Sequence, residues 1–225
     1  MANGEPRPAA PALLRSIEGN AYALMRRRII DGSLVPGTPL ALADLAHELD
    51  ISTMPIRSAL NRLKSEGLVR QLRNRGSIVA PLEIEDFEEI QAIRSGIEAL
   101  AARLGVEQIP PQSLAQMREL LAVLRELSAA EQLNEYFDRE WEFHAVCYGA
   151  SGRTRLVGLV EDFRRRAERY IRLAIASSPG FSQSMAIQER LLALAETHDG
   201  EGAETLMRNA LARSVQQVAT ILEAH

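Results

Sequence analysis

The sequence predicts a mainly α-helical protein made of two domains: a small N-terminal domain of three helices and a β-hairpin, and a C-terminal all-α bundle of six helices. Three observations lead to this prediction. Apolar residues recur at helical spacing along most of the chain, β-type segments occur only around a basic turn near residue 75, and 225 residues suffice for two domains. We expect a disordered leader at 1–13, the first domain at 14–80 and the bundle at 81–225.

The composition excludes membrane-spanning and disulfide-stabilised classes. No apolar run approaches the roughly 18 residues that a membrane helix needs, and residues 1–11 lack the basic and apolar regions of a signal peptide. Cys147 is the only cysteine, so an intrachain disulfide is impossible and a zinc site built on several thiolates is excluded. We therefore expect a cytoplasmic protein with no membrane partner.

Three helical segments are predicted in the first domain. Apolar residues follow one helix face over 17–30, which Asp31 and Gly32 end, and a second helix covers 42–49. After a tight break, Ser52 is placed to cap a third helix. The apolar stripe of that helix consists of Ile56, Ala59, Leu60 and Leu63.

A basic hairpin follows the third helix. Two short β-type segments at 68–72 and 77–80 enclose the turn 73–76, and the order helix, helix, turn, helix, hairpin is that of a winged helix-turn-helix. Up to residue 80 the chain carries 11 basic and 7 acidic residues, against 15 and 23 in the remainder, which favours a polyanion as partner of the first domain. Chance segregation of charge on an ordinary helical domain with a solvated basic loop is the alternative.

Double-stranded DNA is therefore the predicted partner. A recognition helix enters the major groove with its N-terminal residues toward the base edges, and a wing reaches a neighbouring groove. Arg57 can pair with guanine O6 and N7 or bind a phosphate. The residues predicted to contact DNA are Ser52, Thr53, Met54, Arg57, Asn61 and Arg62 on the helix and Arg73, Asn74, Arg75 and Gly76 on the wing.

Several segments of the first domain carry a family resemblance. They are LMRRRIIDGSLVPG at 24–37, LA at 45–46, PIRSALNRL at 55–63, EGLV at 66–69 and RG at 75–76. Together they resemble the DNA-binding domain of GntR-type bacterial transcription regulators. That family commonly has Ser-Arg-Thr-Pro at the start of the recognition helix, where this chain has Ser52, Thr53, Met54 and Pro55. Since each lost base contact changes discrimination by about 1–3 kcal/mol, the operator sequence stays open.

Six helices are predicted in the second domain. Breaks rich in proline and glycine interrupt the helical periodicity at Pro110-Pro111, Ser151-Gly152 and Pro179-Gly180. We expect helices at about 84–104, 114–127, 132–148, 156–174, 181–197 and 201–222. The apolar stripe of the first of them is Ile84, Phe87, Ile90, Ile93, Ile97, Leu100 and Leu104.

Polar residues interrupt the apolar faces of four of these helices. Burial of such groups costs free energy unless they have partners or a ligand, so together they indicate a polar cavity in the bundle. The residues predicted to line it are Arg94, Glu140, His144, Tyr148, Gln188 and Asn209. Each of them could instead be a hydrogen-bonded core residue.

Arg94 is the predicted anchor of this cavity, because a guanidinium on an apolar helix face presents a donor fork to a carboxylate. We therefore expect a small carboxylate as effector. If Glu140 neutralises Arg94 instead, Arg94 becomes structural, and a neutral or cationic effector is expected.

A second set of motifs lies in the bundle: WEFH at 141–144, Ile93-Arg94 and Ile97-Glu98, and Asp199. With the order of six helices, it resembles the FCD effector-binding domain over about residues 84–223. Many members of that family bind a divalent metal through an Asp and a His one turn apart and two later histidines. By position, these ligands fall on Glu140, His144, Gln188, and Asn209 or Ala210. Two of the three histidines are absent, and zinc prefers imidazole to amides, so we expect no cofactor and no tightly held metal.

The sequence thus predicts a ligand-responsive bacterial transcription regulator that binds a pseudo-palindromic operator as a homodimer. One alternative is a regulator whose helical domain only dimerises, and another is a metal-dependent hydrolase that uses Glu140 and His144. His198-Asp199 resembles the His-Asp pair of metal phosphohydrolases, but too few further ligands accompany it, and a helix end followed by an N-cap is the simpler interpretation. No catalytic residue is predicted, and we do not expect an enzyme.

Overall fold

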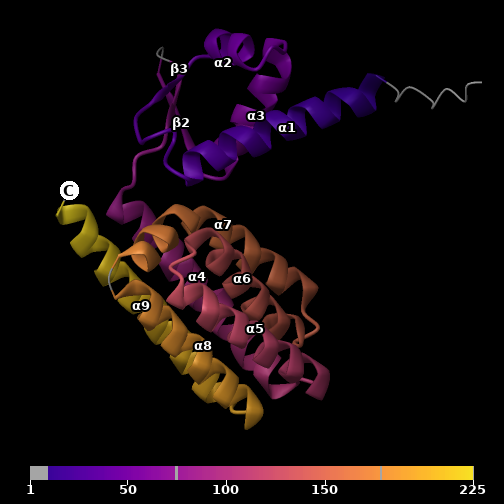
Figure 1. Cartoon of the computed structure of the whole chain (residues 1–225), viewed down its shortest axis with the longest axis vertical. Helices are drawn as coiled ribbons and strands as arrows, with labels where there is room; N and C mark the ends of the chain where they lie inside the picture. The colour runs from indigo at the N-terminus through magenta and orange to yellow at the C-terminus, as the bar shows by residue number, and fades with distance from the viewer. Residues whose placement is uncertain (1–9, 74–75, 178, 225) are drawn as a thin grey trace, which may run out of the picture. The chain divides into compact units, whose positions relative to one another are not determined.

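A computed structural model describes residues 10–73, 76–177 and 179–224 (Figure 1). The chain divides into two compact units, Met1–Pro81 and Leu82–His225. None of the helices in the described ranges is long and apolar enough to cross a membrane. The mainly α-helical fold, with a small hairpin in the first unit and a bundle in the second, confirms the predicted fold class.

The described part of the first unit contains three helices and a small sheet. These elements are α1 (Ala10–Ile30), β1 (Pro39–Leu40), α2 (Leu42–Glu48), α3 (Thr53–Ser65), β2 (Val69–Leu72) and β3 (Gly76–Val79). The sheet is antiparallel in the order β1-β3-β2, and Ile78 lies opposite both Pro39 and Arg70. Strand β1 was not predicted, because two residues are too short to show an alternating pattern.

Helix α1 begins at Ala10, seven residues before its predicted start at Ile17. The assignment of residues 10–13 to a disordered leader is therefore wrong. Pro11 does not prevent a helix there, because the first turn of a helix has no intrahelical acceptor for its N–H groups.

Residues with left-handed backbone end both helices of the helix-turn-helix. Asp50, with φ of 51°, ends α2, and Gly67, with φ of 76°, ends α3. After Gly67 the backbone N–H of Leu68 donates to the carbonyl of Leu63 at 2.9 Å, the bond of a Schellman motif that turns the chain into β2. Ser52 occupies the N-cap position of α3, but its side chain makes no capping hydrogen bond, contrary to the prediction. One of the two N–H groups that it would bind belongs to position N3, which is a proline here.

Six helices make up the second unit within the described residues, as predicted. They are α4 (Ile84–Glu107), α5 (Pro111–Ala129), α6 (Leu133–Gly149), α7 (Thr154–Ala176), α8 (Gly180–Glu196) and α9 (Gly200–Glu223). Helix α4 packs against α6, α7 and α9. Gly105 permits its contact with α6, because a Cβ at that position would lie 2.1 Å from the carbonyl oxygen of Cys147.

The buried face of α4 differs from the predicted stripe. Ile93 and Leu100 are 39% and 42% exposed, whereas Gln91, Arg94 and Glu98 are buried. These three polar residues follow one another at helical spacing and bind one another, so the row can be buried without leaving its charges unpaired.

Candidate functional site

The DNA-contact residues predicted on the recognition helix lie on the exposed side of α3 and at its N-terminus. Pro55, Ile56, Ala59, Leu60 and Leu63 are buried on the opposite face. The exposed side chains are Ser52, Thr53, Met54, Arg57, Asn61 and Arg62. Arg73 and Gly76 are exposed at the turn between β2 and β3, while Asn74 and Arg75 lie outside the described residues.

Arg57 and Arg62 differ in what they contact within the domain. The guanidinium of Arg62 lies 3.7 Å from the ring centroid of Tyr22, and its Nε lies 3.5 Å from Oε1 of Glu66. The Tyr22 hydroxyl donates to the same Glu66 oxygen at 2.7 Å, and burial together with this carboxylate raises the pKa of Tyr22. Arg57 makes no hydrogen bond or ion pair with any described residue. Its guanidinium is therefore fully available to a partner, whereas that of Arg62 is partly engaged.

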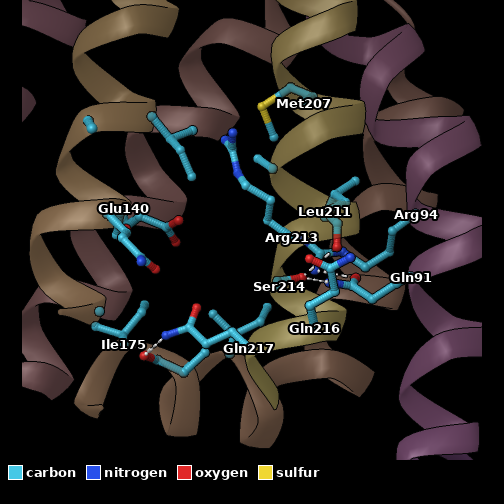
Figure 2. A pocket seen from close by; sticks show the side chains of 18 of the residues that line it. Gln91, Arg94, Glu140, Ile175, Met207, Leu211, Arg213, Ser214, Gln216 and Gln217 are labelled. Atoms are coloured by element: carbon cyan, nitrogen blue, oxygen red, sulfur yellow. Dashed lines mark hydrogen bonds between the residues drawn. The ribbon is translucent and has the colours of Figure 1, made fainter. Parts of the chain in front are cut away.

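The second unit contains a partly open cavity of about 940 Å³ bordered by α4, α6, α7, α8 and α9. Apolar side chains such as Ile175, Met207 and Leu211 form part of its wall (Figure 2). The charged residues among the described lining are Arg94, Arg164, Arg190 and Arg213 together with Glu98 and Glu140. Four arginines against two glutamates make the lining positive overall, with His144 also facing the cavity.

Arg94 lies in the cavity wall as predicted, but its partner is Glu98. Nη2 of Arg94 lies 2.7 Å from Oε2 of Glu98, and Nε donates to the same oxygen at 3.0 Å. Nη1 donates to Oε1 of Gln91 at 2.9 Å, and Gln91 Nε2 donates in turn to Oγ of Ser214 at 2.5 Å. Pairing of Arg94 with Glu140, the alternative raised from the sequence, is therefore not found.

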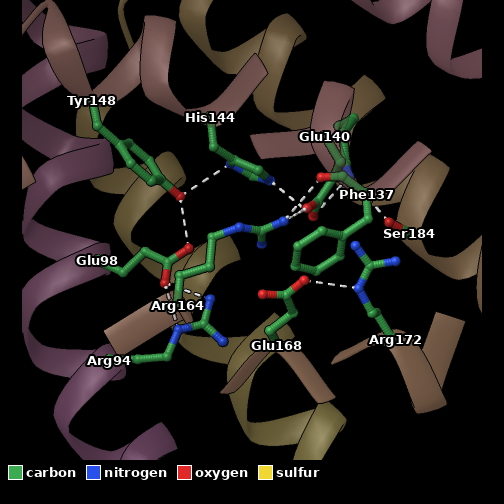
Figure 3. Close-up of polar contacts among 11 residues, drawn as sticks. Arg94, Glu98, Phe137, Glu140, His144, Tyr148, Arg164, Glu168, Arg172 and Ser184 are labelled. Carbon is green, nitrogen blue, oxygen red and sulfur yellow. Dashed lines mark hydrogen bonds and ion pairs between the residues drawn. The ribbon is translucent and has the colours of Figure 1, made fainter. Parts of the chain in front are cut away.

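Glu140 forms its own buried ion pair with Arg164 (Figure 3). Nη2 of Arg164 donates to Oε2 of Glu140 at 2.5 Å and to the carbonyl of Phe137 at 3.2 Å. The other carboxylate oxygen, Oε1, lies 3.4 Å from Nε2 of His144 and accepts from Nε2 of Gln188 at 3.3 Å. Burial alone would raise the pKa of Glu140, but Arg164 and His144 outweigh burial and hold the pKa at about 2. Glu140 is a carboxylate under all ordinary conditions.

Tyr148 connects the two ion pairs. Its hydroxyl donates to Oε1 of Glu98 at 3.0 Å and lies 3.0 Å from Nδ1 of His144, whose other ring nitrogen faces Glu140. Burial, and then the Glu98 carboxylate, raise the pKa of Tyr148 well above its ordinary value, so its hydroxyl keeps its proton. Figure 3 shows the resulting chain of polar contacts across α4, α6 and α7. Tyr148 does not itself line the cavity; it positions residues that do.

Gln188 and Asn209 were also predicted to line the cavity, and neither does. Gln188 is buried behind the cavity wall, where it holds Glu140 and Ser184. Asn209 is exposed and does not line the cavity, so the prediction that it points inward is wrong. Its neighbours one turn away on α9, Leu206 and Arg213, do border the cavity, so Asn209 lies at the exposed edge of this face of the helix.

Arg164 is the residue that sequence reasoning missed. It lies four residues after Val160 and three before Ala167, both on the buried face of α7, which is the criterion that identified Arg94. The neighbouring Arg165 and Arg166 concealed this signal, because a run of three arginines is typical of a solvated face.

Cys147 and the pair His198-Asp199 occupy structural positions in the helical domain. Burial raises the pKa of the Cys147 thiol to about 12, so the thiolate nucleophile is not supplied near neutral pH. His198, with φ of 54°, ends α8, and Oδ1 of Asp199 accepts from the backbone N–H of Gly202 at 2.8 Å. The interpretation of His198-Asp199 as a helix end and an N-cap is confirmed.

The first domain has an exposed recognition helix and a hairpin, and the helical domain that follows has a polar cavity. This combination is typical of two-domain transcription regulators. Comparison with protein families identifies the particular branch. Residues 18–79 match the gntR family of bacterial regulatory proteins, and residues 89–213 match the FCD domain. The chain belongs to the GntR family of DNA-binding transcription regulators and carries an FCD domain.

Named relatives agree with this assignment. The HTH-type transcriptional repressor RspR of Escherichia coli K12 is 24% identical over 204 residues, which cover 88% of each chain. The regulator McbR of the same strain is 28% identical over 201 residues, 88% of this chain and 89% of McbR. The solved structure of E. coli McbR/YncC superposes with a TM-score of 0.70 at 25% identity, covering 92% of this chain and 97% of the other. A putative regulator of Rhodococcus sp. RHA1 has the same fold, with a TM-score of 0.71 at 24% identity, over 91% of this chain and 98% of its own.

Proposed function

We propose that the protein is a ligand-responsive regulator that binds a pseudo-palindromic operator as a homodimer and changes its affinity for DNA when a small carboxylate occupies the cavity of the helical domain. Binding of chromosomal DNA implies that it acts in the cytoplasm. The positive charge of the cavity lining is the observation that supports a carboxylate as the ligand.

The two buried glutamates of the cavity are already neutralised, Glu98 by Arg94 and Glu140 by Arg164. The excess charge comes from Arg190 and Arg213, which are exposed and make no ion pair with a described residue. In Figure 2, Arg213 extends from α9 into the space that Glu140 borders on its other side. An anionic ligand compensates this charge, and guanidinium groups bind carboxylates in a fixed geometry.

The homodimer is supported by an exposed apolar face on α4. Ile93 and Leu100 lie two turns apart on one side of this helix, with Gly96 exposed and Ile97 half-buried between them. A two-fold axis through such a face pairs it with its own copy, which is the usual arrangement of soluble homo-oligomers. Two recognition helices related in this way match the symmetry of a palindromic operator.

The test is a thermal-shift screen of small mono-, di- and tricarboxylates, each paired with its neutral amide, followed by binding to DNA selected from a random pool. We expect at least one acid to raise the melting temperature and change DNA affinity, while its amide does neither. Stabilisation by neutral or cationic compounds alone would contradict the carboxylate. A regulator that responds to no compound in either assay would favour the alternative in which the helical domain only dimerises.

A further inference from the structure

The FCD resemblance implies a divalent metal, and the residues of this cavity do not fit one. Within the described ranges no three His, Cys, Asp or Glu side chains come together in a group that could hold a metal ion. Of the positions that correspond to the family ligands, Glu140 and His144 carry suitable donors, Gln188 offers an amide, and Ala210 offers none. Neutral amides are poor ligands for zinc and the transition metals.

The Glu140 carboxylate is nevertheless paired with a positively charged side chain. The guanidinium of Arg164 binds Oε2 of this carboxylate, while His144 faces Oε1. Arg164 is almost completely buried and is held from a second side by the ring of Phe137, whose centroid lies 4.3 Å from the guanidinium carbon. A divalent ion bound to the same carboxylate would lie against this fixed positive charge, and the repulsion at such a distance in a protein interior is large.

We propose that Arg164 is a built-in cation that takes the place of the divalent metal on Glu140, so that the cavity is complete without a metal ion. The inference rests on the proposed function only in treating this cavity as the ligand site.

The arrangement leaves part of the guanidinium available to a ligand. Both hydrogen bonds that Arg164 makes with described residues use Nη2, and neither Nε nor Nη1 bonds to a described residue, although the side chain lines the cavity. By contrast, all three nitrogens of Arg94 are engaged by Glu98 and Gln91. An anion in the cavity therefore meets the side of the Arg164 guanidinium that makes no hydrogen bond to a described residue.

Zinc binding tests the inference without any knowledge of the effector. The missing imidazoles are supplied by the double variant Gln188→His/Ala210→His, which is compared with and without Arg164→Met by calorimetry and thermal shift with Zn²⁺ alone. We expect the double variant, which keeps the native ion pair, to bind Zn²⁺ weakly, and the triple variant to bind about 100-fold more tightly or better. Zinc should also raise the melting temperature of the triple variant, because it restores a positive partner to Glu140.

Two controls define the result. Arg172 lies on the same helix as Arg164, pairs with Glu168 and covers the same Phe137 ring, so Arg172→Met in the double variant should leave zinc binding weak. Glu140→Gln in the triple variant should abolish the tight site. Equal zinc affinity of the double and triple variants, or a tight Glu140-dependent zinc site in the unaltered protein, would overturn the proposal. A triple variant that binds Zn²⁺ no more tightly than the unaltered protein would also overturn it.

Discussion

Arg94 and Glu98 form a buried ion pair within a single helix, with Nη2 and Oε2 2.7 Å apart. Neither side chain faces bulk water, and Gln91 and Tyr148 bind the remaining polar atoms of the pair. Such a pair adds little net stability compared with apolar residues, but loss of one partner leaves an uncompensated buried charge. Burial of this face of α4 therefore requires that the two charges be kept together or replaced together.

Glu98→Gln should lower the free energy of unfolding by about 3–5 kcal/mol, because it strands the Arg94 guanidinium. Restoring neutrality with Arg94→Met in the same chain should recover part of the loss. Urea denaturation measures the free energy of unfolding of the single and the double variant. The matched control is Glu196→Gln, which removes an exposed pair with Arg118, 2.8 Å long, and should change stability by about 1 kcal/mol or less. Equal effects at Glu98 and Glu196 would show that the α4 pair is not a buried charge pair in solution.

The Glu140 carboxyl gives stability a defined dependence on pH. Its folded-state pKa of about 2 lies below the ordinary value of 4.5, so its contribution is complete above about pH 4.5 and is lost as pH falls toward 2. Glu140→Gln removes this contribution at every pH. We therefore expect the stability difference between the unaltered protein and Glu140→Gln to be largest near neutral pH and to shrink as pH falls through this range. Urea unfolding between about pH 6 and about pH 3 checks this, and a difference independent of pH contradicts it.

Helix positions were predictable because periodicity and breaking residues act locally. The six bundle helices and the end of α3 at Gly67 follow from such signals. The polar core of the bundle was only partly predictable. The spacing of Arg94 and Glu98 in one helix was visible, but the pairing of Glu140 with Arg164 joins α6 to α7 and depends on how the helices pack. Periodicity identifies which side chains turn inward, and it contains no information on which of them meet.

The exposed face of α4 illustrates the opposite error. Ile93 and Leu100 were assigned to the core because apolar residues at helical spacing usually face it. Helical spacing alone does not distinguish an apolar face that packs in the core from one that stays exposed at the surface, as Ile93 and Leu100 do here. A short strand such as β1, which exists only because β3 pairs with it, is likewise invisible in the sequence.

On the DNA-binding face, Arg57→Ala should weaken binding to selected operator DNA by about 1–3 kcal/mol, because this side chain has no partner within the domain. Arg62→Ala should have a smaller effect on DNA binding and a larger one on domain stability, since Arg62 stacks on Tyr22 and pairs with Glu66. Titrations at several salt concentrations separate the contact types: each lost phosphate contact lowers the slope of log affinity against log salt by about 0.9. Equal losses in operator and random DNA for Arg57→Ala would assign that residue to phosphate rather than to a base.

The arginines of α7 provide a matched test of the effector site. For a carboxylate identified by the thermal-shift screen, Arg164→Lys should weaken binding about 10-fold or more, because a lysine keeps the charge but loses the planar donor fork. Arg172→Lys should leave the affinity unchanged, since Arg172 does not line the cavity. Calorimetry in the presence and absence of EDTA measures both variants and shows whether the chelator matters. Acid binding that is lost on chelation, or that is equally weakened by both substitutions, contradicts the role of Arg164.

The exposed face of α4 predicts which residues hold the proposed homodimer together. Leu100→Glu places a charge in the apolar stripe that contains Ile93, and we expect it to convert the dimer to a monomer because an interface buries that charge without a partner. Leu159→Glu is the control, since Leu159 on α7 is 49% exposed and lies outside this stripe. Sedimentation analysis gives the mass of each variant. Since a monomer holds one half-site at a time, Leu100→Glu should also lower operator affinity by about 100-fold, while Leu159→Glu should not. A dimer that survives Leu100→Glu but dissociates with Leu159→Glu would place the interface on α7 instead.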